Sequence, residues 1–133
     1  MRRPVSQADD LQRRVEAFAD RSIQFVESLP ASMTAQRLGG QFLDASTSVA
    51  ANYRAARRGR SYAEFTAKVG IVAEEADESV FWLNRIVKAG IRTDVAVEPL
   101  LAEAEELARI FGATGAPPPR HQMIQFPNSA NFQ

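Results

Sequence analysis

Apolar residues recur at steps of three and four along four segments of the chain, which is the spacing of a helix with one buried face. The first segment, about 8–29, ends at Leu29 because a residue that precedes a proline disfavours the helical conformation. The second, about 32–58, begins with Ser32 as a helix N-cap and stops before Gly59. The apolar stripe of the first helix is Leu11, Val15, Phe18, Phe25 and Leu29, and that of the second is Leu38, Phe42, Ala45, Val49, Asn52 and Ala56.

The third and fourth segments carry clear start and stop signals. Ser61 followed by Glu64 predicts a capping box at the start of a helix over about 61–89, which ends at Gly90. Its predicted stripe is Phe65, Val69, Val72, Ala76, Val80, Leu83 and Val87. The fourth helix, about 94–112, must place Pro99 in its first turn, because a helix interior does not tolerate proline.

These segments predict an all-α protein in which residues 1–112 form an up-down-up-down four-helix bundle. No segment shows the alternating pattern of a strand. The very short connection between the two central helices requires that they lie antiparallel. Residues 113–133 are rich in proline and have no period, so we expect an irregular tail. Its apolar Ile124, Phe126 and Phe132 leave docking on a neighbour open as an alternative.

The outer faces of the two central helices are not those of a simple solvated bundle. At about 100° per residue, the side opposite the core stripe carries small residues, isolated apolar residues and charges of both signs. We therefore predict that these faces are buried between subunits, with arginines near 54–58 meeting glutamates near 74–78. The alternative is a solvated face on which one tryptophan lies flat. The candidate interface residues are Gly40, Leu43, Thr47, Ala51, Arg54, Ile71, Glu75, Glu78 and Trp82.

Asn52 falls at the edge of the core stripe, where we predict a buried polar residue with a structural role. A buried asparagine fixes the register of a helical bundle at a cost in stability. Capping of the bundle end is a second structural role, and ligand binding is the functional alternative.

The arginines at the turn between the central helices form the main candidate for recognition chemistry. The net charge is zero overall, but residues 31–70 carry six basic side chains against two acidic ones. Arginines bind phosphate and an aromatic ring stacks on a base, so this turn is a candidate nucleic-acid site. The alternative is that the arginines stabilise the helix end and pair with glutamates. The candidate residues are Arg54, Arg57, Arg58, Arg60 and Tyr62.

The composition argues against catalysis and against a metal or other cofactor. The chain has no cysteine, and its one histidine, His121, lies in the tail. A di-metal carboxylate bundle requires Glu-x-x-His motifs, which are absent. No apolar run follows Arg2 and Arg3, and no stretch reaches the roughly 18 apolar residues of a membrane span. We therefore expect a non-enzymatic, soluble, cytoplasmic protein without cofactors.

Residues 41–86 resemble a known family, the bacterial four-helix bundle proteins also called 23S rRNA intervening-sequence proteins. The resemblance rests on Gln41-Phe42-Leu43, Thr47-Ser48-Val49-Ala50-Ala51-Asn52-Tyr53-Arg54-Ala55-Ala56, Arg60-Ser61, Glu64-Phe65, Lys68-Val69-Gly70-Ile71-Val72, Glu74-Glu75-Ala76-Asp77-Glu78-Ser79 and Phe81-Trp82-Leu83. Outside this region the similarity is limited to the helix pattern.

The resemblance implies a ring-shaped homo-oligomer, typically a homopentamer, with no established enzymatic function. It also implies kinship with accessory proteins of diversity-generating retroelements, pentameric bundles that bind a reverse transcriptase and nucleic acid. Those relatives are strongly basic, whereas this chain is neutral and has Asp44 where the family commonly has arginine.

The leading hypothesis from the sequence is a non-catalytic homo-oligomeric scaffold or interaction protein. The alternative is an accessory factor that binds RNA, DNA or a reverse transcriptase through the arginine-rich turn.

Overall fold

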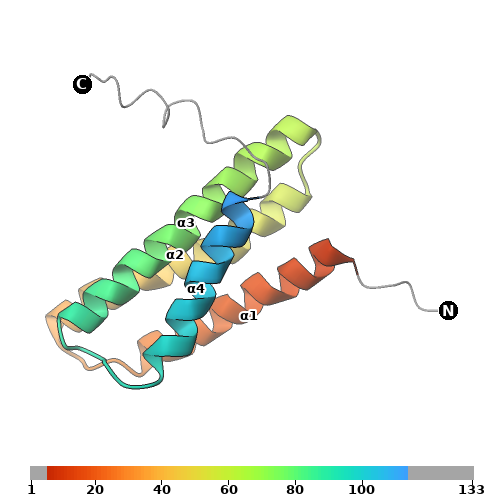
Figure 1. Cartoon of the computed structure of the whole chain (residues 1–133). Helices are drawn as coiled ribbons and strands as arrows, with labels where there is room; N and C mark the ends of the chain where they lie inside the picture. The colour runs from red at the N-terminus through yellow and green to blue at the C-terminus, as the bar shows by residue number, and fades with distance from the viewer. Residues whose placement is uncertain (1–5, 114–133) are drawn as a thin grey trace.

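The computed structural model describes residues 6–113, which form four helices (Figure 1). These are α1 (Gln7–Glu27), α2 (Met33–Arg57), α3 (Tyr62–Lys88) and α4 (Val97–Gly112). The predicted all-α four-helix fold is confirmed, and the described residues contain no strand. The predicted tail lies, apart from its first residue, outside the described residues.

The start of α4 differs from the prediction by three residues. The carbonyl of Asp94 accepts a hydrogen bond from the N–H of Val97 at 3.1 Å, and its carboxylate accepts one from the N–H of Ala96 at 3.2 Å. These bonds hold residues 94–96 in a turn, so the helix begins only at Val97. Pro99 therefore lies in the first turn of α4, as predicted.

Each helix packs against its neighbour in the chain, α1 on α2, α2 on α3 and α3 on α4. The closing contact of the bundle, between α1 and α4, is the sparsest, and the backbones of helices at opposite corners do not come close to each other. This is the up-down-up-down arrangement. As a consequence, the outer face of α2 and α3 lies on the side of the bundle opposite to the seam between α1 and α4.

Three serine side chains begin the first three helices. Ser6, Ser32 and Ser61 each accept a hydrogen bond from the backbone N–H three residues later, at 3.0, 3.1 and 3.1 Å. This satisfies one of the free N–H groups at each helix start. At α3 the carboxylate of Glu64 accepts a hydrogen bond from the N–H of Arg60 at 2.9 Å, one residue earlier than in a standard capping box.

Gly90 ends α3 in a backbone conformation that requires glycine. Its φ is 71°, in the left-handed region. The N–H of Ile91 donates to the carbonyl of Ile86 at 3.1 Å, and the N–H of Gly90 donates to that of Val87 at 2.9 Å. These two bonds define a Schellman motif, and Ile91 then packs against the core.

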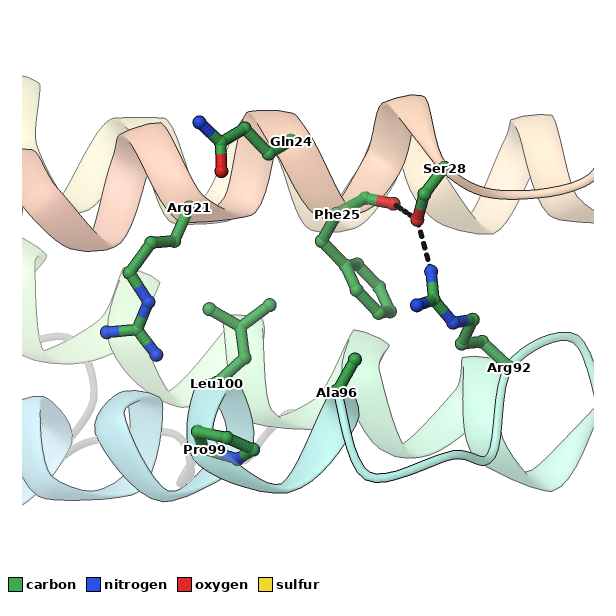
Figure 2. Close-up of a pocket in the computed structure, with 8 residues that line it drawn as sticks. All are labelled: Arg21, Gln24, Phe25, Ser28, Arg92, Ala96, Pro99 and Leu100. Carbon is green, nitrogen blue, oxygen red and sulfur yellow. Dashed lines mark hydrogen bonds between the residues drawn. The ribbon is translucent and has the colours of Figure 1, made fainter.

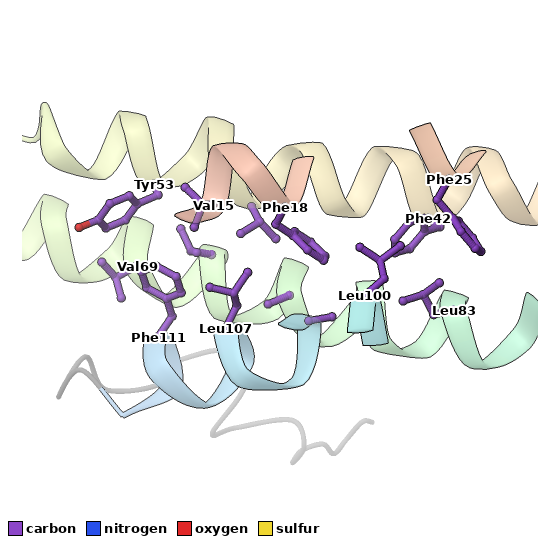
Figure 3. Close-up of a cluster of buried hydrophobic side chains, with 14 of the residues drawn as sticks. Val15, Phe18, Phe25, Phe42, Tyr53, Val69, Leu83, Leu100, Leu107 and Phe111 are labelled. Atoms are coloured by element: carbon purple, nitrogen blue, oxygen red, sulfur yellow. The ribbon is translucent and has the colours of Figure 1, made fainter. Parts of the chain in front are cut away.

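The hydrophobic core combines aliphatic side chains with several aromatic rings (Figure 3). The ring of Phe42 meets those of Phe18 and Phe25 edge-to-face, with centroids 6.4 and 5.9 Å apart. Nearer the other end of the bundle, Tyr53 packs on Phe111 with centroids 5.1 Å apart. Such pairs add about 0.5–1.5 kcal/mol to the stability that comes from apolar burial.

The predicted stripe of α3 is correct in its first half and displaced in its second half. Ser79 and Ile86 are fully buried, whereas Val80 and Val87 lie at the edge of the core. The hydroxyl of Ser79 donates a hydrogen bond to the carbonyl of Glu75 at 2.9 Å. Because this bond satisfies the hydroxyl, a serine occupies a core position that the pattern had assigned to valine.

Candidate interaction surfaces

The four arginines of the turn divide into one that is paired and three that pair with no described residue. Arg57 donates hydrogen bonds to the carboxylate of Asp9 at 2.9 Å and to the side-chain oxygen of Gln12 at 3.2 Å. The bond from the Arg57 guanidinium is also the main reason why the pKa of Asp9 is lowered. Arg57 therefore joins the end of α2 to α1, and its guanidinium is engaged within the chain.

The other members of the turn are exposed to solvent. Arg54, Arg58 and Arg60 form no ion pair with any residue from 6 to 113. The side chain of Tyr62 is 74% exposed, and its ring lies 6.5 Å from that of Phe65 at an interplanar angle of 30°. Three cations and an exposed aromatic ring thus share one end of the bundle.

The outer face of α2 is formed by small side chains around one leucine. A side chain added at Gly40 would meet no atom within 4 Å, and Ala51 is exposed. The hydroxyl of Thr47 donates to the carbonyl of Leu43 at 2.7 Å, which turns its polar group toward the backbone. Leu43 is partly buried but does not belong to the core cluster. This face is low in relief and has few polar groups to desolvate.

On α3, the predicted interface residues have two different environments. Ile71 is partly buried outside the core, as Leu43 is on α2. Trp82, in contrast, packs against the edge of the core within its own chain, so its placement opposite the core stripe was wrong. The reason is that the core stripe of α3 passes through Ser79 and Ile86, which moves Trp82 to the flank of this stripe.

The exposed aromatic residue of α3 is Phe81, which the sequence analysis did not select. Its side chain is 51% exposed, its ring meets Trp82 edge-to-face at 4.9 Å, and the guanidinium of Arg85 lies 5.4 Å from its centroid. The same helical projection could have found Phe81, because it stands directly opposite the core once Ser79 is assigned to the core.

Four carboxylates form an acidic cluster where α2 and α3 adjoin, defined here as Asp44, Glu74, Glu75 and Glu78. The pKa of Glu75 is raised, first by burial and then by repulsion from Glu78, Glu74 and Asp44. One carboxylate oxygen of Glu74 is sheltered from solvent and has no hydrogen-bond partner among the described residues. None of the four forms an ion pair within residues 6–113. The cluster therefore contains negative charge that no cation among residues 6–113 pairs with.

Asn52 is partly buried rather than buried, which corrects the prediction of a buried asparagine. Its amide nitrogen donates to the carbonyl of Ser48 at 2.9 Å, one turn earlier in α2. The adjacent Tyr53, which is 3% exposed, occupies the core position instead. It lies between the buried Val49 and Ala56 on the buried face of α2. Asn52 has no hydrogen bond to another helix, so its visible role is local to α2.

The described residues hold neither a candidate metal site nor a helix that could span a membrane. They contain no group of three or more histidine, cysteine, aspartate or glutamate side chains that could hold a metal ion. None of the helices in that part of the chain is long and apolar enough to cross a membrane. What the surface does present is a low-relief face on α2 and α3, an acidic cluster and a set of unpaired arginines. Together with the fold, these features define a class of small helical-bundle proteins with candidate interaction surfaces.

The chain belongs to the 23S rRNA-intervening sequence protein family, whose model matches residues 10–113. This confirms the resemblance inferred from residues 41–86 and extends it to all four helices. No curated protein matches the chain.

A solved structure with the same fold is that of a protein of unknown function from the S23 ribosomal protein family of Bacteroides thetaiotaomicron VPI-5482. It aligns with a TM-score of 0.75 and 23% identity, over 81% of this chain and 96% of that chain. At this identity the similarity establishes the fold alone. Neither the family description nor the description of this solved structure names an enzymatic activity.

Proposed function

We propose that this protein is a non-catalytic scaffold that assembles with copies of itself through the outer face of α2 and α3. The observation that carries the proposal is that opposite charges on the two central helices do not pair with each other among the described residues. Arg54 is exposed and has no ion pair, and the acidic cluster has no cation within the described residues.

The spacing of these charges favours pairing between chains. Arg54 and Asp44 are ten residues apart on α2, which corresponds to about 15 Å along the helix axis at about 1.5 Å per residue. An arginine side chain does not span that distance, so Arg54 cannot neutralise the acidic cluster of its own chain. A second copy displaced along the bundle can bring its arginine to the cluster, where a guanidinium pairs well with carboxylates.

The uncharged part of the face supports close packing between helices. Gly40, Thr47 and Ala51 present little side-chain bulk, and Leu43 and Ile71 add apolar surface outside the core. Small residues let the backbones of two helices approach each other, and burial of the apolar side chains then stabilises the contact. Desolvation of Thr47 is inexpensive because its hydroxyl already donates to its own helix.

In the proposed contact, the outer residues of α2 in one copy meet the outer residues of α3 in the next copy, so two different surfaces are used. Such a contact is heterologous, and it closes into a ring when the rotation between copies permits closure. The family resemblance adds the expectation of a pentamer. The assembly therefore has a fixed number of subunits and presents several identical copies of its remaining surfaces to a partner.

The proposal is tested by light scattering on a sizing column with two matched variants of α2. Leu43→Glu places a charge in the proposed interface, and Met33→Glu places the same charge on a residue that is 72% exposed at the start of the helix. We expect the wild-type protein and Met33→Glu to elute as one assembly of several times 14.7 kDa, and Leu43→Glu to elute as a folded monomer. Equal masses for all three proteins would contradict the proposed interface.

A second candidate function is nucleic-acid binding, which is favoured by the exposed Tyr62 beside Arg58 and Arg60. The test is fluorescence polarisation with a labelled single-stranded RNA over a range of salt concentrations. Replacing Arg58 and Arg60 by glutamine should lower the salt slope by about one per arginine that contacts a phosphate. Arg37→Gln, an exposed position near the other end of α2, is the control. A slope that the double replacement leaves unchanged would exclude this site.

A further inference from the structure

A cleft of about 440 Å³ opens where the C-terminal half of α1 faces the start of α4 (Figure 2). It lies at the seam between α1 and α4, on the side of the bundle opposite to the proposed interface. The cleft therefore uses none of the residues of the proposed interface. Its lining residues are Arg21, Gln24, Phe25, Ser28, Arg92, Ala96, Pro99 and Leu100.

The two cations of the cleft differ in how they are held. Arg92 donates from its Nε to both carboxylate oxygens of Asp94 at 3.1 Å and from a terminal nitrogen to the hydroxyl of Ser28. Its guanidinium also lies 5.6 Å from the ring centroid of Phe25. Arg21 forms no hydrogen bond or ion pair with any of residues 6–113, and Figure 2 shows its side chain extending from α1 toward α4.

The potential in the cleft is positive because no lining residue is acidic. Asp94 neutralises Arg92 from outside the lining, but Arg21 has no such partner. The N-terminus of α4 also lies here, but the carboxylate of Asp94 accepts a hydrogen bond from the N–H of Ala96, and Glu98 lies in the first turn. These carboxylates offset the partial positive charge of the helix start, so the positive charge of the cleft comes from the arginines.

The wall between the two arginines is apolar. Phe25 and Leu100 are 7% and 3% exposed, and Pro99 and Ala96 continue the surface on α4. Arg92 is held at Ser28, which lies seven residues after Arg21 in the chain. This separation corresponds to about 10.5 Å along the axis of α1. An apolar body therefore fits between an unpaired guanidinium at one end of the cleft and a tethered guanidinium at the other.

We propose that this cleft binds a small amphipathic anion, with its carboxylate on Arg21 and its apolar body against Phe25, Pro99 and Leu100. A carboxylate accepts two parallel hydrogen bonds from a guanidinium, which gives the anionic end a defined position. The apolar body covers the exposed side chains of Pro99 and Ala96 and the small exposed parts of Phe25 and Leu100, which favours binding. Arg92 and Ser28 form the far end of the cleft and limit the length of the ligand.

The test is an NMR titration of the full ¹⁵N-labelled chain with octanoate, with 1-octanol as the neutral probe of the same length. We expect octanoate to cause saturable shifts at the amides of Gln24, Phe25 and Leu100 and at the side-chain Nε–H of Arg21. Arg21→Gln should weaken binding at least about fivefold, because it removes the charge-assisted bonds. Arg37→Gln removes an exposed arginine of α2 outside the cleft and should leave binding unchanged.

A second variant tests the cleft without altering its charge. Ala96→Leu adds apolar volume at an exposed lining position and should abolish binding, whereas Ala102→Leu adds the same volume at an exposed position of α4 outside the lining. Absence of saturable shifts with octanoate would overturn the proposal. Equal binding of octanol and octanoate would overturn it as well, because the cleft would then select an apolar ligand without regard to charge.

Discussion

The ion pair between Arg14 and Glu103 is expected to be the strongest single polar contact across the seam between α1 and α4. The Nε and a terminal nitrogen of Arg14 donate to the two carboxylate oxygens of Glu103 at 2.7 and 2.9 Å. The same bond to Glu103 raises the pKa of Arg14. Because α1 and α4 make few other contacts, loss of this pair should loosen the seam.

The magnitude follows from the exposure of the two side chains. Arg14 is 40% exposed and Glu103 17% exposed, so the pair lies between a solvated surface pair and a buried one. Exposed pairs contribute about 0.2–1 kcal/mol, and hydrogen bonds to charged groups about 1.5–3 kcal/mol. After allowance for solvent screening at Arg14, we expect a coupling energy of about 1 kcal/mol.

The assay is a double-mutant cycle with Arg14→Gln and Glu103→Gln, measured by urea unfolding at a fixed protein concentration. The matched control is the pair of Arg13 and Asp10 within α1, whose side chains are 60% and 66% exposed. Its coupling energy should be no more than about 0.3–0.5 kcal/mol. If the two cycles give the same coupling energy, the bidentate geometry and lower exposure of the Arg14 pair have no energetic effect and the reasoning is refuted.

Three further predictions concern the core, a helix end and the acidic cluster. Phe42→Ala removes the ring that joins Phe18 and Phe25 and should lower the free energy of unfolding by about 3–5 kcal/mol in urea titrations, unlike an exposed control such as Ala102→Ser. Gly90→Ala forces a side chain into a φ of 71° and should cost about 1 kcal/mol in thermal unfolding, whereas Gly112→Ala, which lies in open space at negative φ, should not. Glu75→Gln should stabilise the isolated chain near neutral pH. The pKa of Glu75 is raised in the folded state, so its ionised form opposes folding, and the gain should vanish as the pH falls below the ordinary carboxylate range. A gain that persists in acid would contradict this assignment.

The helices were predictable because their signals are local. Ser32 and Ser61 start helices as N-caps, Gly90 ends one, and Pro99 lies in a first turn, all as the sequence indicated. Each of these features depends on interactions within one helical turn. The alternation of three- and four-residue steps predicted the number of helices, and the short connection between α2 and α3 required these two helices to be antiparallel.

The surfaces were less predictable because they depend on the phase of each helix and on partners far along the chain. Ser79 was passed over as polar although its hydroxyl is satisfied by its own helix, and this displaced Trp82 to the outer face in the prediction. Arg57 was grouped with its neighbours because no sequence pattern links it to Asp9, 48 residues earlier. The cleft between α1 and α4 has no local signal either, since Arg21 and Arg92 come together only in the bundle.

The most direct test of the account is the mass of the wild-type assembly, measured by sedimentation velocity over a range of protein concentrations. Assembly into a closed ring through α2 and α3 predicts one species with a fixed mass of several times 14.7 kDa. Because the ring is closed, this mass does not grow further as the protein concentration rises. A species of 14.7 kDa at every concentration would contradict self-association through α2 and α3. A mass that grows continuously with concentration would show that the contact does not close.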